Sequence, residues 1–217
     1  MFQGIVFDMD GLMFDTERLA LDAWQAVCAP LGYADAAAVA LRTVGLDTAN
    51  TERVFWAAYG TDFPFDHLRD AWGRWMADAI AREGVPLKPG LFALLDYLKA
   101  HGIRMTAATS TPQWKAQKYF AQTGVDAYFT DFISGDQIQN GKPAPDIYLA
   151  ACALLDLPPE GCLALEDSLY GIESAHRAGL KAVMIPDLLQ PDAKTKALLY
   201  DKVNSLTDVI SLLKGWS

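Results

Sequence analysis

The chain begins with a short apolar and partly β-branched run, residues 4–7, that ends at Asp8. A run without polar alternation predicts a strand that is buried on both faces of a sheet. Strands are expected over residues 4–7, 103–109, 129–134, 162–165 and 182–185, and helices over residues 91–101, 145–155 and 170–178. A further helix is expected after Thr111, with Pro112 in its first turn. This alternation predicts an α/β fold with a Rossmann-like parallel sheet and right-handed crossovers.

Residues 16–86 follow a different pattern. Apolar and aromatic side chains recur at helical spacing there, and no run typical of a strand interrupts them. Residues that favour turns punctuate the segment: Pro30, Gly32, Gly45, Gly60 and Pro64. We therefore predict a core domain made of residues 1–15 and 87–217, with an all-helical domain, residues 16–86, inserted into it.

Polar side chains stand where several of the expected strands end. Asp8 ends the first strand, Thr109 the second, and Glu166-Asp167 the fourth. Parallel α/β sheets bind their ligands at the carboxyl ends of the strands. The sequence therefore predicts that these residues, although far apart in the chain, meet at one edge of the sheet.

The first of these segments reads Asp8-Met9-Asp10-Gly11. An Asp-Gly pair between apolar residues is also typical of a β-hairpin turn, and the local pattern alone leaves that explanation open. Two aspartates one residue apart can also divide the work of a reaction. One stays ionised and attacks, while the other, with a raised pKa, carries a proton.

The pair Glu166-Asp167 is the second acidic segment. Asp167 or Ser168 can simply cap the helix that follows. Carboxylates gathered near Asp8 and Asp10 would, however, repel one another unless a cation lay between them. Hard oxygen ligands favour Mg²⁺, which commonly binds through one or two carboxylates and the phosphate of a substrate.

Two further segments can hold an anion. Thr109, Ser110 and Thr111 join a strand to the amino terminus of a helix, where N–H groups and the helix dipole attract anions, although ordinary capping explains the same residues. Lys142 lies between Gly141 and two prolines, which stiffen the backbone. A fixed ammonium there can neutralise a phosphoryl group, whereas a surface lysine in a turn is the plain alternative.

Composition narrows the class of protein. Apolar residues make up 52% of the 217 residues, which is enough for a buried core, and the formal net charge is −9. A nucleic-acid-binding surface needs the opposite sign of charge. The three cysteines, Cys28, Cys152 and Cys162, form no CxxC pair, so neither a zinc site nor a disulfide framework is expected. With no signal peptide and no membrane span in the pattern, we expect a cytoplasmic monomer without a membrane or nucleic-acid partner.

Four motifs occur in a fixed order along the chain: Phe7-Asp8-Met9-Asp10-Gly11 with Asp15-Thr16-Glu17; Thr109-Ser110; Gly141-Lys142-Pro143-Ala144-Pro145-Asp146; and Glu166-Asp167-Ser168 with Gly171-Ile172-Glu173-Ser174-Ala175 and Ala178-Gly179. In this order they resemble the haloacid dehalogenase-like (HAD) hydrolases. Within that superfamily they are most similar to the β-phosphoglucomutase-like and pseudouridine-5′-phosphatase-like phosphatases with a helical cap. The resemblance covers nearly the whole chain.

The resemblance implies a phosphatase that acts through a covalent intermediate. Asp8 would attack phosphorus and form an aspartyl phosphate. Asp10 would protonate the leaving oxygen and then deprotonate the water that hydrolyses the intermediate. Thr109, Ser110 and Lys142 would hold the phosphoryl oxygens.

The resemblance also implies a metal ion and a cap. Asp8, the backbone carbonyl of Asp10, and Asp167 would ligate Mg²⁺, with Glu166 as a further ligand or as the partner of a ligand. The inserted domain, residues 16–86, would be a cap that closes over the substrate and excludes water.

A phosphomutase of the same family is the main alternative activity. β-Phosphoglucomutases carry a histidine where this chain has Ala20, and a lysine and an arginine where it has Val44 and Thr48. A mutase must hold a bisphosphate, which requires cationic donors. We therefore expect hydrolysis rather than phosphate transfer between sugar positions.

Two related reactions and a role without catalysis fit the residues less well. No lysine precedes Lys88, so the insert cannot form the Schiff base that phosphonoacetaldehyde hydrolases use. Haloacid dehalogenases lack the second aspartate of the first motif, which here is Asp10. A catalytically silent binding module would belong to another functional class, and the intact motif set argues against it.

The substrate is expected to be a small phosphorylated metabolite, either a sugar, a polyol or a nucleoside phosphate. Aromatic residues of the insert could stack on a base, although such side chains more often pack a core. They are Trp56, Tyr59, Trp72 and Trp75. Arg42 and Asp47, in the same insert, are the candidates for contact with the leaving group.

Overall fold

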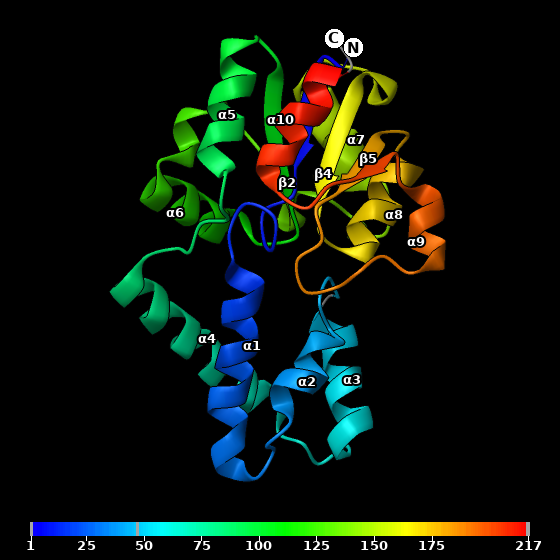
Figure 1. The fold of residues 1–217 in the computed structure, drawn as a ribbon. Coiled ribbons are helices and arrows are strands. Elements are labelled where there is room, and N and C mark those ends of the chain that lie inside the picture. Colours follow the sequence, from blue (N-terminus) through cyan, green and yellow to red (C-terminus); the bar gives the residue numbers. More distant parts are fainter. Residues whose placement is uncertain (1, 47, 216–217) are drawn as a thin grey trace. The chain divides into compact units, whose positions relative to one another are not determined.

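The computed structural model describes residues 2–46 and 48–215. It divides the chain into two compact units, one made of Met1–Phe14 and Leu87–Ser217 and the other of Asp15–Pro86. We call them the sheet unit and the helical unit. Figure 1 shows the helices and strands of each unit.

The sheet unit is built on parallel strands. Among the described residues the sheet has six strands in the order β3-β2-β1-β4-β5-β6, and every pair of neighbours is parallel. The strands are β1 (Gly4–Phe7), β2 (Arg104–Thr109), β3 (Ile133–Ser134), β4 (Cys162–Glu166), β5 (Lys181–Met184) and β6 (Asp201–Lys202). The α/β fold with a parallel sheet and an inserted helical segment, predicted from the sequence, is confirmed.

Strand β1 lies at the centre of the sheet and fixes the register of the functional edge. All four of its residues are buried, as its unbroken apolar sequence requires. Phe7 pairs with Ala107 of β2 on one side and with Leu165 of β4 on the other. One residue further along, Asp8 therefore lies beside Glu166.

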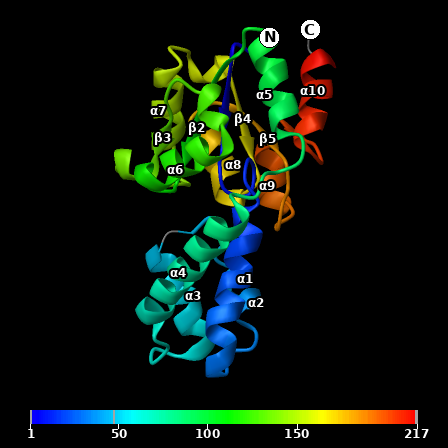
Figure 2. The ribbon, with the colours of Figure 1, turned by 90° about the vertical axis from the view of Figure 1, so that its left-hand side faces the viewer.

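Helices cover both faces of this sheet. Helices α5 and α10 lie side by side on one face (Figure 2). Helices α7 and α8 pack against each other, and a cluster of apolar side chains fills the space between them and the strands. The helices of the sheet unit are α5 (Leu91–Ala100), α6 (Gln113–Thr123), α7 (Asp146–Leu154), α8 (Leu169–Arg177), α9 (Ala193–Leu198) and α10 (Leu206–Gly215). Short 3₁₀ turns are Val125–Ala127, Gly135–Gln137 and Pro159–Gly161.

Three details differ from the sequence expectations. The strand expected over residues 129–134 is reduced to Ile133–Ser134, because Phe129 and Phe132 pack their rings against Phe120 of α6 instead of extending the pairing. Pro112 has an extended backbone and precedes α6 rather than lying in its first turn. The short edge strand β6 carries no apolar run and was not expected.

The two segments that lead out of the sheet unit are tied together close to Asp8. Phe14 and Leu87 form an antiparallel bridge. The Lys88 N–H donates to the Met13 carbonyl at 2.9 Å, and the Lys88 ammonium forms an ion pair of 2.7 Å with Asp187, which is buried after β5. The segment around Asp8 is therefore anchored on the sheet unit itself.

The helical unit contains α1 (Thr16–Cys28), the 3₁₀ turn Ala29–Leu31, α2 (Ala36–Leu41), α3 (Thr48–Tyr59) and α4 (Phe65–Glu83). Its core is aromatic: Trp24 packs against Phe55, Phe65 and Trp72. Phe55 is fully buried and also stacks on Phe63. None of the helices in the described part of the chain combines the length and the hydropathy needed to span a membrane.

Most of the aromatic residues considered for base stacking serve this core. The Trp72 indole donates to the Ala20 carbonyl at 3.0 Å, and the Trp56 indole donates to the Phe63 carbonyl at 3.4 Å. The Tyr59 hydroxyl donates to Asp35 at 2.6 Å. Packing within the helical unit therefore accounts for these three rings.

The aromatic core generates a stability prediction. Phe55→Ala should lower the free energy of unfolding by about 3–5 kcal/mol, because it leaves a cavity among rings that cannot collapse. Leu31→Ala, at a side chain that is 58% exposed, should change it by less than about 0.5 kcal/mol. Urea denaturation followed by near-ultraviolet circular dichroism measures both. An equal loss of unfolding free energy in the two variants would contradict the buried position of Phe55.

Candidate active site

The segment after β1 forms a compact turn rather than a hairpin. The Met13 and Phe14 N–H groups both donate to the Met9 carbonyl, at 2.9 and 3.1 Å, and the Gly11 N–H donates to the Phe14 carbonyl at 2.8 Å. Since β1 pairs only with parallel neighbours among the described residues, the hairpin explanation of the Asp-Gly pair is wrong. The turn places Asp8 at the end of the strand.

Gly11 allows this turn to lie against the second acidic segment. Its φ of +85° is in the left-handed region that favours glycine. A Cβ added at this position would overlap the Asp167 carboxylate. The turn after β1 and the end of β4 are therefore in direct contact, as the register of the strands requires.

Lys142 joins the two acidic segments. Its ammonium lies 2.5 Å from Asp8 Oδ1 and 2.6 Å from Glu166 Oε1, and it donates to the Ala108 carbonyl at 3.3 Å. Its side chain is only 5% exposed. The surface-lysine explanation is therefore wrong, and this cation is a buried part of the site.

Glu166 is fully buried, and both of its oxygens accept hydrogen bonds from the protein. Oε1 accepts from Lys142 and from the Tyr148 hydroxyl at 2.7 Å. Oε2 accepts from the N–H groups of Asp167 and Ser168, each at 3.2 Å, and from the Ser168 hydroxyl at 3.0 Å. With its oxygens filled in this way, Glu166 is suited to hold Lys142 in place rather than to ligate a metal ion.

The segment around Lys142 is fixed to α8. The Ser174 hydroxyl donates to the Ala144 carbonyl at 2.5 Å, and the Asn140 side chain donates to Asp146 at 2.9 Å. Ser168 caps α8 through the Gly171 N–H at 3.0 Å, which confirms the capping role considered for it. These contacts set the direction from which Lys142 enters the site.

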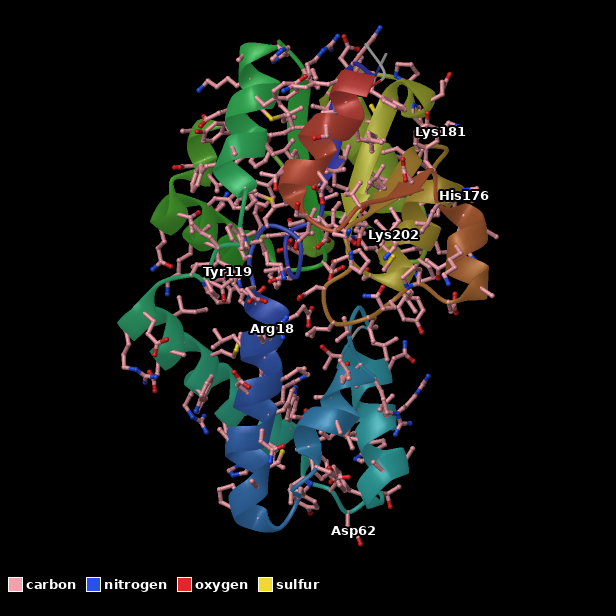
Figure 3. The ribbon with its side chains drawn as sticks, viewed as in Figure 1. Arg18, Asp62, Tyr119, His176, Lys181 and Lys202 are labelled. Carbon is pink, nitrogen blue, oxygen red and sulfur yellow. The ribbon has the colours of Figure 1, made fainter. Side chains whose placement is uncertain are left out.

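Strand β2 brings hydroxyl groups to the same edge. Thr109 is buried, and its oxygen accepts from the Thr111 N–H at 3.0 Å. The Thr111 hydroxyl donates to Asp10 Oδ2 at 2.7 Å. Ser110 is exposed. Figure 3 shows Tyr119 of α6 near this edge. The pKa of its hydroxyl is raised above the usual value, mainly by burial and further by the charge of Asp10.

Carboxylates outnumber ammonium groups among the described residues that meet at Lys142. Three buried carboxylates, of Asp8, Glu166 and Asp167, face one buried ammonium. Burial raises the pKa of Asp8 well above its usual value, Lys142 lowers it, and Glu166 and Asp10 raise it further. Burial lowers the pKa of Lys142, but Asp8 and Glu166 outweigh this effect and raise it above its usual value. The ammonium stays charged, and the carboxyl groups around it outnumber it.

The donor set fits a hard divalent cation. One oxygen from each of Asp8, Glu166 and Asp167 lies within 4.8 Å of the others. The distances admit Glu166 as a ligand, whereas the hydrogen bonds to both of its oxygens favour a role as the partner of Lys142. Asp8 and Asp167 offer carboxylate oxygens of the kind that a hard divalent cation prefers, and such a cation would offset the surplus of carboxylates.

The structure thus brings most of the expected site residues together: Asp8, Asp10, Thr109, Lys142, Glu166 and Asp167. The candidates for contact with the leaving group stand apart from them in the chain. Arg42 is exposed at the end of α2 in the helical unit. Asp47 lies outside the described residues.

Sequence reasoning missed the residues that hold the site in shape. Tyr148 is a buried tyrosine in a largely aliphatic helix, which could have indicated a buried polar partner. The sequence indicates Thr111 as part of an anion-binding helix start and gives no sign of its contact with Asp10. Its hydroxyl contacts a residue 101 positions earlier, and no local pattern reveals such a contact.

Comparison with known proteins agrees with this geometry. The family model described as haloacid dehalogenase-like hydrolase matches residues 2–179. The chain is 29% identical to a phosphorylated carbohydrates phosphatase of Thermotoga maritima, over 98% of this chain and 91% of that protein. It is 33% identical to a probable pseudouridine-5′-phosphatase of Drosophila melanogaster, over 88% of this chain and 84% of that protein. The crystal structure of CbbY from Rhodobacter sphaeroides in complex with phosphate gives a TM-score of 0.76 at 27% identity, over 96% of both chains. The resemblance seen in the motifs is confirmed.

Alanine substitution of two helical glycines should change the free energy of unfolding in opposite directions, because only one of them lies against the site. Gly73 lies in α4 with open space around it, so Gly73→Ala should stabilise the protein by roughly 0.5–1 kcal/mol through helix propensity. Gly171 lies in α8, and a Cβ there would overlap the Glu166 carboxylate. Gly171→Ala should therefore destabilise the protein by about 1–3 kcal/mol. Urea denaturation of both variants measures this, and a stabilised Gly171→Ala protein would refute the proposed packing.

Proposed function

Because the chain belongs to the haloacid dehalogenase-like hydrolase family, we propose that it is a magnesium-dependent phosphatase that removes phosphate from a small phosphomonoester. The observation that carries the proposal is the placement of Lys142. Its ammonium, buried between Asp8 and Glu166, lies beside the carboxylate that would attack. An anionic phosphoryl group can approach a carboxylate only where such a cation offsets the repulsion.

In the first step an Asp8 oxygen forms a bond to phosphorus. The bond between phosphorus and the leaving oxygen breaks, and its electron pair goes to that oxygen. Asp10 donates the proton that the leaving oxygen needs. Lys142 and the hydroxyl groups of Thr109 and Ser110 donate to the phosphoryl oxygens.

In the second step water replaces Asp8 on phosphorus. Asp10 accepts a proton from the water while the bond from Asp8 to phosphorus breaks and its electron pair returns to the carboxylate. The same carboxyl group thus serves first as acid and then as base, which restores the starting state.

Mg²⁺ would be held by Asp8, the backbone carbonyl of Asp10, and Asp167, and when bound it neutralises charge on the phosphoryl group and on the nucleophile. The carboxylates that gather near Asp8 support this ligand set. Glu166 acts through Lys142, since its own oxygens are already filled.

The substrate class we propose is a sugar, polyol or nucleoside phosphate. The names of the relatives support it: one is a phosphatase of phosphorylated carbohydrates, and the other bears the name of a pseudouridine-5′-phosphatase. The helical unit would act as the cap that selects the leaving group, with Arg42 and Asp47 as its contacts. Stacking of a base on Trp56, Tyr59 or Trp72 is disfavoured, because these rings pack within the helical unit.

Phosphate release from a panel of phosphomonoesters tests the activity. The panel contains hexose, polyol and nucleoside phosphates and pseudouridine 5′-phosphate, each measured with and without Mg²⁺. Asp8→Asn removes the nucleophile and should lower turnover on the order of 10³-fold or more. Asp126→Asn, the same change at an exposed position of the sheet unit, should leave turnover unchanged. Conversion of a hexose 1-phosphate to an isomer without phosphate release would support the mutase instead.

Binding of Mg²⁺ can be measured without substrate. At about 100 times its Kd the ion should stabilise the protein by about 2.7 kcal/mol, which raises the melting temperature by roughly 5–10 °C. Asp167→Asn should lose most of this rise because it removes a ligand, whereas Asp126→Asn should keep it. A full rise in Asp167→Asn would exclude Asp167 from the ligand set.

A further inference from the structure

The Thr111 hydroxyl links the segment after β2 to the turn after β1. It donates to Asp10 Oδ2 at 2.7 Å. Asp10 is the residue whose carboxyl group would carry the proton in the proposed reaction. This hydrogen bond fixes the position of one oxygen of the Asp10 carboxyl group.

Thr111 is not needed to cap the helix that follows it. A threonine can cap a helix when it directly precedes the first helical residue, but Pro112 occupies that position before α6. The Gln113 N–H at the start of α6 instead donates to the Asp136 carboxylate, at 3.1 and 3.3 Å. Asp136 is itself held by the Ser134 hydroxyl at 2.6 Å. A residue from another segment thus caps α6, and the Thr111 hydroxyl is committed to Asp10.

The backbone holds Thr111 in the orientation that this contact needs. Its N–H donates to Thr109 Oγ1 at 3.0 Å. Pro112 follows, which restricts the backbone of Thr111 to extended conformations. A Cβ added at Gly135 would lie 2.5 Å from the Ser110 carbonyl oxygen, so the neighbouring segment packs closely against this connection. The hydroxyl is therefore oriented before substrate binds.

We propose that Thr111 is a positioning residue that orients the Asp10 carboxyl group for proton transfer to the leaving oxygen. The inference rests on the proposed phosphatase function. While Asp8 bonds to phosphorus and the leaving oxygen takes the electron pair of the broken bond, the proton moves from the Asp10 carboxyl group to that oxygen. Thr111 keeps its own proton and only fixes the geometry.

The dependence of the rate on the leaving group tests this role. An alkyl alcohol needs a proton as it leaves, whereas p-nitrophenolate leaves without one. Thr111→Val keeps the shape and removes the donor. Its kcat/KM, which reports phosphoryl transfer to Asp8, should fall roughly 10- to 100-fold for an alkyl phosphate, as part of the 10²–10⁴-fold that acid catalysis provides. For p-nitrophenyl phosphate it should fall less than about 3-fold.

Two variants complete the experiment. Thr111→Ser restores the donor and should recover kcat/KM for the alkyl phosphate to within about 3-fold of the wild type. Thr123→Val makes the same change at the other end of α6, where the hydroxyl donates to the Tyr119 carbonyl, and should leave the ratio of the two rates unchanged. Because both substrates are measured on one preparation, the ratio does not depend on the folded fraction.

The possible outcomes separate this inference from the proposed function. Equal losses on both substrates, no loss on the alkyl phosphate, or failure of Thr111→Ser to recover activity would each overturn the positioning role while the phosphatase stands. A wild-type protein that releases phosphate from neither compound would overturn the phosphatase, and the role of Thr111 with it.

Discussion

The buried ammonium of Lys142 is the interaction on which the rest of the site depends. It contacts Asp8 and Glu166 at once, and the two carboxylates come from neighbouring strands whose register places them side by side. Without a cation between them, the buried carboxylates of Asp8 and Glu166 would repel each other strongly. The pairing of β1 with β4 brings the two carboxylates together, and Lys142 makes that pairing possible by lying between them.

That constraint explains the small and polar residues around the site. Gly171 leaves room for the Glu166 carboxylate, and Gly11 leaves room for that of Asp167. Tyr148 and Ser168 donate to the oxygens of Glu166 alongside Lys142. A buried carboxylate is tolerated only when its hydrogen bonds are satisfied, so these residues stabilise the site rather than react.

The sequence predicted the structure best where an apolar run ends in a polar side chain. The apolar run before Asp8 and the polar residues at strand ends predicted both the parallel sheet and the edge at which the site forms. The strand prediction failed at residues 129–132, where the apolar side chains pack against a helix, because periodicity does not tell a strand from a packed loop. It also left the role of Glu166 open, because that role depends on donors from α7 and from the backbone after β4.

The surplus of carboxylates links the chemistry of the site to the stability of the fold. Three carboxylates are held beside one ammonium because the central strands are buried on both faces and cannot shift to separate them. A divalent cation relieves this repulsion, so the energy with which it binds is also energy of folding. The rigid sheet thus holds the carboxylates close together before any ligand binds. This arrangement suits a metal ion and a phosphoryl group. We propose that the helical unit selects the leaving group. The hydrogen bonds that hold Asp8, Asp10 and Glu166 in place come from Lys142, Thr111 and Tyr148 of the sheet unit, so this selection can vary without changing those residues.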